Sequence, residues 1–355
     1  MKILNSSLWD LPSPSTMTYF WNFGSTLGLC LAIQIFTGLI LTFHYTSYAE
    51  ERFTSLVEIM REVWSGWVLR FVHINGASVF FFFIYLHLFR GMFYIRAVHK
   101  KVWIRGVTII ILLMGISFLG YVLPWGQISY WAVAVITNLI SIAPIIGEEL
   151  VKWIWGGFSV GAPTLTRFYS LHFLLPFILA FLVILHLFFL HKEGSRNRLG
   201  VRRNIDKISF HPYFSVKDLL FILTVLFVSI SISFYLPYIL GDAINNVPAN
   251  TIQTPIHIQP EWYFLTSYAI LRALPRKTAG VLALLASVII FYTMILFQTK
   301  FSTKFRNYRM IVFWIIISRF VFLIKIGALP AEEPYVFLRK IGAIVYFTSL
   351  LLVNL

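Results

Sequence analysis

The sequence predicts an all-α, polytopic membrane protein with eight transmembrane helices. Hydrophobic residues make up 59% of the 355 residues and charged residues only 12%, roughly half the charged fraction of a typical soluble domain. Two pairs of histidines, each pair fourteen residues apart, lie inside long apolar stretches. These observations indicate that lipid surrounds much of the chain and that the polar groups buried within it have a function.

Eight apolar stretches reach or approach the ~20 residues that a helix needs to cross a bilayer. Both histidine pairs fall in the first four stretches, so we expect a redox half at 1–200 and a pocket-completing half at 201–355. The expected spans are residues 23–45, 67–95, 104–125, 165–190, 218–240, 279–299, 310–329 and 335–353.

The formal net charge of +15 is concentrated in three connections, at residues 96–105, 192–217 and 300–309. These follow spans 2, 4 and 6 and so share one side, whereas most acidic residues lie in the other connections. This is the positive-inside distribution, and it places both termini on the basic side. The basic residues therefore set the topology, and the aromatic-basic interleaving of RNA-binding motifs is absent.

The N-terminal residues and the cysteine content narrow the possibilities further. Residues 1–10 lack the basic and apolar regions of a signal peptide, so we expect the spans themselves to direct insertion. The single cysteine, Cys30, excludes an intrachain disulfide and a zinc–cysteine cluster. No Cys-x-x-Cys-His motif occurs, so any haem is held without thioether links.

The histidine pairs are His73 with His87 and His172 with His186. On a helix, fourteen residues advance about 1400°, roughly 40° short of four turns, with a rise of about 21 Å. Both rings of a pair therefore project from nearly one face, one near each side of the bilayer core. A single buried histidine is more often a packing residue, but two equally spaced pairs favour axial ligands of two stacked bis-histidine b haems.

Glycines repeat the same interval, as Gly24 with Gly38 and Gly106 with Gly120. They offer room for a macrocycle edge at the heights of the two histidine layers, although small residues also simply let helices approach. Arg70 and Arg90 lie three residues outward from His73 and His87. Their guanidinium groups could form ion pairs with haem propionates. Alternatively, the side chains could extend to the lipid headgroups.

Two further clusters suit quinone chemistry. Glu261 lies in a Pro-Glu-Trp-Tyr motif within a long loop at about 237–279, on the acidic side. Desolvation there would raise the pKa of the carboxyl and let it accept a proton, with a surface cap as the alternative. On the basic side, polar residues flank the connection between spans 4 and 5 and could bind quinone carbonyls and supply protons, or could be ordinary loop residues. They are His191, Ser195, Lys217 and Asp218.

Seven short runs within residues 20–300 carry a family resemblance: Trp21–Ser25, His73–Ser78, Gly120–Gln127, Trp153–Val160, Arg167–Pro176, His211–Tyr213 and Pro260–Leu265. On these runs, the chain resembles cytochrome b of the mitochondrial and bacterial quinol:cytochrome c reductase (complex III). The last two spans match mainly in position and hydropathy. The resemblance implies ubiquinol as the substrate, two non-covalent b haems, and proton translocation by a Q cycle.

The resemblance also implies roles for individual residues. His73 and His172 would hold the low-potential haem iron on the intermembrane-space side, and His87 and His186 the high-potential haem iron on the matrix side. The quinol-oxidation site would comprise Glu261, Tyr268, Tyr121, Phe118 and Ala132, and the quinone-reduction site His191, Ser195, Asp218 and Lys217.

Ala132 stands where the family usually has glycine, so we expect a slightly narrower oxidation pocket and altered inhibitor sensitivity. The implied partners are a Rieske iron–sulfur protein, a membrane-anchored c-type cytochrome, accessory complex III subunits and a second copy of the complex. The implied location is the mitochondrial inner membrane, with both termini in the matrix.

Two other functions remain open from the residues alone. A two-haem transmembrane ferric or oxygen reductase would need a nucleotide-binding domain with a Gly-rich loop, or a partner that carries one. A proton-coupled transporter using His and Glu as relays would show inverted repeats or broken helices. The sequence contains no convincing instance of either feature.

Overall fold

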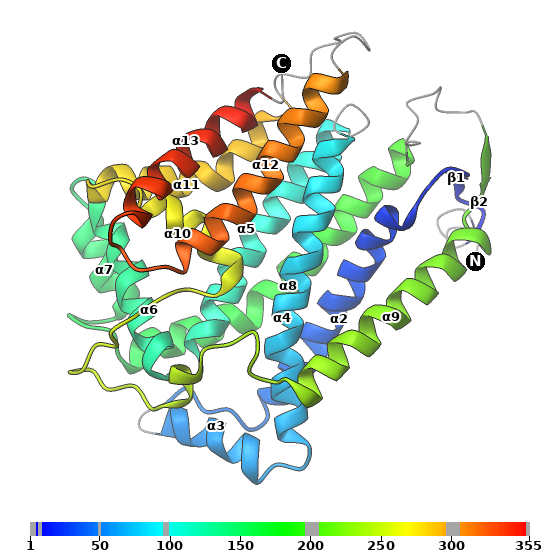
Figure 1. Ribbon diagram of the computed structural model, residues 1–355. Coiled ribbons are helices and arrows are strands. Elements are labelled where there is room, and N and C mark those ends of the chain that lie inside the picture. Colours follow the sequence, from blue (N-terminus) through cyan, green and yellow to red (C-terminus); the bar gives the residue numbers. More distant parts are fainter. Residues whose placement is uncertain are drawn as a thin grey trace. The chain divides into compact units, whose positions relative to one another are not determined.

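The computed structural model describes residues 5, 9–48, 51–94, 99–195, 206–295 and 306–352, and these residues are mostly α-helical (Figure 1). Seven helices in this part of the chain are long and apolar enough to cross a membrane, which confirms the all-α polytopic fold. They are α2 (Phe23–Leu41, preceded by η2, Tyr19–Asn22), α4 (Gly66–Phe93), α5 (Lys100–Val122), α8 (Ala162–Glu193), α9 (Tyr213–Tyr235), α12 (Arg306–Gly327) and α13 (Tyr335–Leu352).

The sixth expected span, 279–299, corresponds to α11 (Lys277–Thr293). This helix is apolar but has only 17 residues, and the last four residues of the expected span, 296–299, lie outside the described part. The seven long helices and α11 together match the eight expected spans in order.

Shorter elements occupy the connections. The first long loop contains α6 (Gln127–Asn138), η4 (Leu139–Ile142) and α7 (Gly147–Trp155), and the second contains η5 (Ala243–Asn246), η6 (Trp262–Phe264) and α10 (Leu265–Leu271). Helix α3 (Glu51–Arg61) follows α2. Near the N-terminus, β1 (Pro12–Pro14) pairs antiparallel with β2 (Lys207–Ser209), with Pro12 opposite Ser209.

The helices form two compact units. The first unit comprises 1–40, 68–113 and 176–237, and the second comprises 41–67, 114–175 and 238–355. Helices α2, α4, α5 and α8 contribute residues to both. The division of the chain at residue 200, expected from the histidine distribution, stays a prediction.

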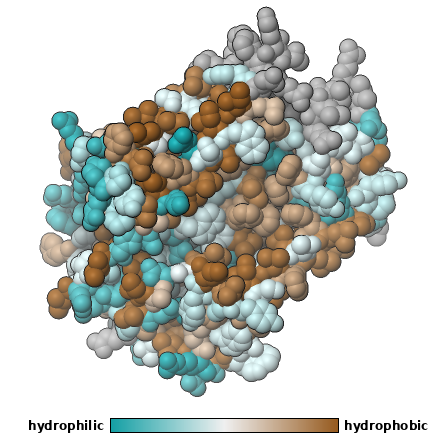
Figure 2. Space-filling model, in the orientation of Figure 1, coloured by the Kyte–Doolittle hydropathy of each residue, from teal (hydrophilic) through white to brown (hydrophobic). Residues whose placement is uncertain are grey.

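Large apolar side chains point outward from the long helices, as lipid rather than water requires. Phe227 of α9 is 73% exposed and Ile344 of α13 is 63% exposed, and Figure 2 shows hydrophobic residues along the visible faces of both helices. In the second unit, by contrast, a well-packed cluster forms around Trp125, Tyr130 and Phe168. This cluster fixes the end of α5 and the start of α6 as a rigid platform.

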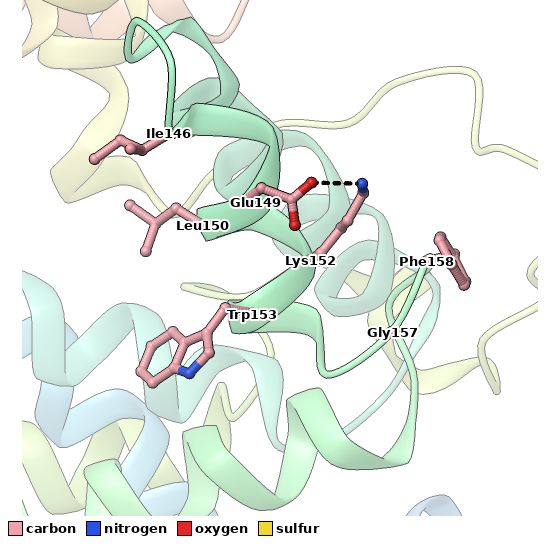
Figure 3. Close-up of a pocket in the computed structure, with 7 residues that line it drawn as sticks. All are labelled: Ile146, Glu149, Leu150, Lys152, Trp153, Gly157 and Phe158. Atoms are coloured by element: carbon pink, nitrogen blue, oxygen red, sulfur yellow. Dashed lines mark hydrogen bonds and ion pairs between the residues drawn. The ribbon is translucent and has the colours of Figure 1, made fainter.

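An open groove of about 590 Å³ runs along α7 (Figure 3). Its one ion pair joins Lys152 Nζ to Glu149 Oε1 at 2.8 Å, and no residue predicted for a haem or quinone site lines it. The lining residues are Ile146, Glu149, Leu150, Lys152, Trp153, Gly157 and Phe158.

Candidate haem and quinone sites

The structure brings one predicted ligand pair together in the first unit. His87 of α4 and His186 of α8 have ring centroids 6.4 Å apart, with their planes at 59°. Arg90 Nη2 donates a hydrogen bond to His87 Nδ1 at 3.0 Å, and its guanidinium lies 5.6 Å from the centroid of the Trp21 ring. Ligation of a metal by His87 Nε2 needs the proton on Nδ1, so the guanidinium would have to turn to another acceptor.

His73, also in the first unit, already has the tautomer that a metal ligand needs. Its Nδ1 lies 2.9 Å from Thr37 Oγ1, and the Thr37 hydroxyl donates to the Ile33 carbonyl at 2.7 Å. The hydroxyl hydrogen is thereby used, so Nδ1–H donates to Oγ1 and the Nε2 lone pair remains for a metal. Arg70 lies three residues before His73 on α4 and is buried.

His172 shows the same arrangement in the second unit. Its Nδ1 donates to the Ile116 carbonyl on α5 at 2.9 Å, which again leaves Nε2 for a metal. Because His73 and His172 belong to different units, their pairing on one haem stays a prediction.

All four predicted glycines face the four predicted histidines. A Cβ atom added at each glycine would meet a histidine Cε1 as its nearest neighbour, at 3.5 Å for Gly24, 3.1 Å for Gly38, 3.3 Å for Gly106 and 2.4 Å for Gly120. The partners are His87, His73, His186 and His172, respectively. The missing side chains thus leave space beside the rings rather than between helix backbones. The residues therefore fit two haem groups with axial histidines.

Glu261 immediately precedes η6 in the second unit, and its side chain is half-buried. Burial and the nearby Asp242 carboxylate raise the pKa of Glu261 to about 7. Both carboxylates lie close enough to Tyr121 to interact with it electrostatically. At neutral pH the Glu261 carboxyl can therefore both accept and release a proton.

The loop that carries Asp242 is fixed against α6. The backbone N–H of Gln127 donates to Val247 O at 3.0 Å, and its side-chain Oε1 accepts from Asn250 N–H at 2.8 Å. Asn245 Oδ1 accepts from the N–H of Ser129 at 2.9 Å. These bonds hold the position of Asp242 within the second unit.

The remaining residues predicted for quinol oxidation also lie in the second unit. Ala132 is buried on α6 (5% exposed), and Phe118 packs edge-to-face on Phe168 with centroids 5.9 Å apart. The Tyr268 hydroxyl donates to Ile258 O at 3.1 Å. Tyr268 thus bonds to the chain three residues before Glu261.

On the basic side, the first unit brings Lys217 and Asp218 of α9 to the N-terminal segment. Lys217 Nζ donates to Met17 O at 2.8 Å, and Asp218 hydrogen-bonds to the side chain of Ser25. His191 and Ser195 are half-buried at the end of α8, and in the described part of the chain no hydrogen bond joins them to Asp218. Lys217 and Asp218 therefore contact the N-terminal segment, and the grouping of all four residues in one site stays a prediction.

Sequence reasoning missed Thr37, Ser25 and the role of Asp242. Thr37 is adjacent to Gly38, so a hydroxyl beside a predicted haem glycine was the available signal. Asp242 is the one carboxylate besides Glu261 in residues 237–279, but the charge pattern assigned it only to topology. Ser25 offered no signal beyond its place in a matching run.

Comparisons with known proteins agree with this geometry. The family model "Cytochrome b/b6/petB" matches residues 8–194, and "Cytochrome b(C-terminal)/b6/petD" matches residues 248–347. A chain in a solved structure of a hyperthermophilic respiratory complex III is 30% identical, with a TM-score of 0.93 over 99% of this chain and 95% of that one. The two family models match most of the present chain, which therefore belongs to the cytochrome b family, whose members hold two b-type haems. The contacts between the predicted glycines and histidines are compatible with this assignment.

Proposed function

We propose that the chain is the haem-bearing subunit of a respiratory quinol:cytochrome c reductase (complex III). The observation that carries the proposal is the set of four glycine–histidine contacts, because they explain both fourteen-residue spacings at once. The similarity to a chain of a solved complex III supports the assembly.

Four histidines hold the two haems in this proposal. His87 and His186 would hold the high-potential haem, and His73 and His172 the low-potential one. Bound b haem would supply one-electron transfer, and ligation by two histidines would leave no position for oxygen. Thr37 and the Ile116 carbonyl keep Nε2 of His73 and His172 available, and Arg70 and Arg90 bind propionates.

Quinol is oxidised on the acidic side, next to Glu261. Removing two electrons from a quinol releases two protons, and a carboxylate with a pKa of about 7 accepts one of them at neutral pH. Phe118, Tyr121, Ala132 and Tyr268 complete this pocket. An iron–sulfur partner would accept one electron of the quinol, and haem held by His73 and His172 would supply the acceptor for the second.

Quinone is reduced on the basic side. Asp218 and Lys217 supply protons and bind the carbonyl oxygens, and His191 and Ser195 bind the opposite edge of the ring. Proton uptake here and release near Glu261 together move charge across the membrane in a Q cycle.

The wider assignments follow from the resemblance. They are a Rieske iron–sulfur protein, a membrane-anchored c-type cytochrome and accessory subunits as partners, a homodimeric complex, and the mitochondrial inner membrane with both termini in the matrix. The solved relative comes from a hyperthermophilic complex III, and the candidate spans of this chain support a multi-pass membrane location.

An anaerobic optical titration of membranes containing the protein, with quinol as the only reductant, tests the proposal. We expect two b-type signals that are separable by potential, and loss of one of them in His186→Ala. Haem signals that respond to dithionite but never to quinol would favour a ferric or oxygen reductase. Full retention of both signals in His186→Ala would reject the ligand assignment.

A further inference from the structure

A fully buried arginine organises the turn between α12 and α13. Arg339 is 0% exposed, and its Nε and Nη2 donate to Ile326 O at 3.3 and 3.1 Å. Nη2 also donates to Leu329 O at 2.5 Å and Pro330 O at 2.9 Å. These carbonyls lie at and beyond the end of α12, where backbone oxygens lack partners within the helix. A single guanidinium thus holds the shape of the turn at 326–330.

Another carbonyl of this turn, that of Ala328, contacts the loop of Glu261. Ala328 O lies 3.2 Å from His257 Nε2, which is also 3.3 Å from Gln259 Oε1. Both neighbours are acceptors, so Nε2 carries a proton and donates to them. His257 precedes Glu261 by four residues, with Pro260 between them. A short segment therefore connects the bond at Ala328 to the carboxylate.

Helix α10 holds the same segment from its other side. Tyr268 donates to Ile258 O, and α10 packs so closely on α12 that a Cβ at Gly327 would lie 2.5 Å from Leu265 O. Arg339 interacts electrostatically with both Tyr268 and Arg272 of this region. All these residues belong to the second unit. Segment 257–261 is thus held between α10 and the α12–α13 turn.

We propose that Arg339 and His257 are positioning residues for quinol oxidation. Arg339 fixes the turn at 326–330, the turn holds His257 through Ala328, and His257 sets the place of Glu261. The inference rests on the proposed role of Glu261, and it assigns the last two spans a function in quinol oxidation. If Arg339 only capped α12, its replacement would disturb the turn and leave segment 257–264 unchanged.

Hydrogen–deuterium exchange of the purified complex separates these two roles. Arg339→Lys keeps the charge but removes the Nε donor and the planar guanidinium fork that place Nη2 among three carbonyls. We expect faster exchange at both 326–334 and 257–264. His257→Leu should speed exchange at 257–264, and His257→Gln, which retains a side-chain N–H, should restore it. His44→Leu, at an exposed histidine of the same unit, is the matched control. Unchanged exchange at 257–264 in both Arg339→Lys and His257→Leu would overturn the proposal.

The reduction of haem by quinol, measured with the quinone-reduction site blocked, supplies the functional readout. We expect Arg339→Lys and His257→Leu each to lower kcat about ten- to a hundredfold, as small misplacements of reacting groups do, with haem content and KM near those of the parent. The double variant should be no slower than the slower single variant, because both act through one chain of contacts. Multiplied losses would overturn the shared route.

Glu261→Gln, measured in parallel, separates this inference from the proposed function. If Glu261→Gln slows quinol oxidation but His257→Leu does not, the positioning role is wrong and the proposed function stands. If Glu261→Gln has no effect, the role of Glu261 fails and the positioning role fails with it.

Discussion

A single methyl group at position 120 has almost no room. The added Cβ would lie 2.4 Å from Cε1 and 2.7 Å from Nε2 of His172, so the ring would have to leave its place. We expect Gly120→Ala to lose the haem that His172 ligates and to retain the other, which optical difference spectra of membranes would show.

Gly115→Ala is the matched control for this change. It lies on the same helix, and a Cβ there would meet nothing within 4 Å. Normal spectra in both variants would mean that the ring at position 172 can move without loss of haem, and the ligand assignment would lose its main support.

The hydroxyl of Thr37 acts on His73 through one hydrogen bond. A hydrogen bond from Nδ1 makes the imidazole a better donor to iron, which favours the oxidised state. We therefore expect Thr37→Val to raise the reduction potential of one haem by less than ~59 mV. That value corresponds to a tenfold change in the ratio of the affinities for oxidised and reduced haem in a one-electron couple. Redox titration monitored optically measures the shift.

Thr26→Val is the control for the Thr37 prediction. Thr26 lies on the same helix and donates only to Asn22 O of its own turn. A shift of equal size in both variants would assign the effect to the helix rather than to His73.

At the scale of single residues, the sequence was enough to propose the four histidines as ligands but not to find the residues that contact them. His73, His87, His172 and His186 recur at a fixed interval, and one helix geometry converts that interval into a shared face. Thr37 lies 36 positions before the ring that it contacts, so only the fold of two helices reveals the pair. Arg339 and His257 likewise act on carbonyls of another element.

At the scale of elements, the loop that carries Asp242 contributes to the raised pKa of Glu261, in addition to burial. The Asp242 carboxylate also accepts from the N–H of Ile244 and so caps η5. Asn at this position would keep the cap and remove the charge that helps to raise the pKa of Glu261. We expect Asp242→Asn to lower that pKa by up to about one unit.

The sign of this effect appears in the pH profile of quinol oxidation. The rate of the parent should rise as pH increases through about 7, because Glu261 must be ionised to accept a proton. In Asp242→Asn the rise should occur at lower pH. A profile measured from pH 5 to 9 that is the same in both proteins would contradict the influence of Asp242 on Glu261.

The same pKa shift has a consequence for stability. The folded chain binds the Glu261 proton more tightly than the unfolded chain, whose glutamate pKa is about 4.3. This contribution to stability is therefore full below about pH 4.3 and is lost as pH rises toward about 7. In Asp242→Asn, this stabilisation should be lost at a lower pH than in the parent.

Elements with strong periodicity or long apolar runs were predictable, and those shaped by contacts were not. Seven of the eight expected spans match long helices, since roughly 20 apolar residues have few alternatives in lipid. The grouping into two units, with α2, α4, α5 and α8 contributing to both, leaves no local trace in composition. The bonds between α6 and segment 245–250 also join residues more than a hundred positions apart.

The topology of the whole chain depends on α11. The charge pattern needs eight crossings to place both termini on one side, but α11 has only 17 residues in the described part of the chain. A helix of this length rises about 26 Å, slightly less than the ~30 Å hydrocarbon core. If α11 crosses, the turn between α12 and α13 lies on the acidic side with the loop after span 3. If it does not, that turn lies on the basic side.

Cysteine labelling distinguishes these topologies, because Cys30 is only 6% exposed and gives a low background. We expect Glu148→Cys and Glu332→Cys to react with a membrane-impermeant maleimide from one side of sealed vesicles, and Lys192→Cys from the other; all three positions are exposed. Labelling of Glu332→Cys from the same side as Lys192→Cys would show that α11 does not cross. It would also separate the α12–α13 turn from the side of the membrane on which Glu261 accepts its proton, and the positioning role of Arg339 would fall with the eight-span topology.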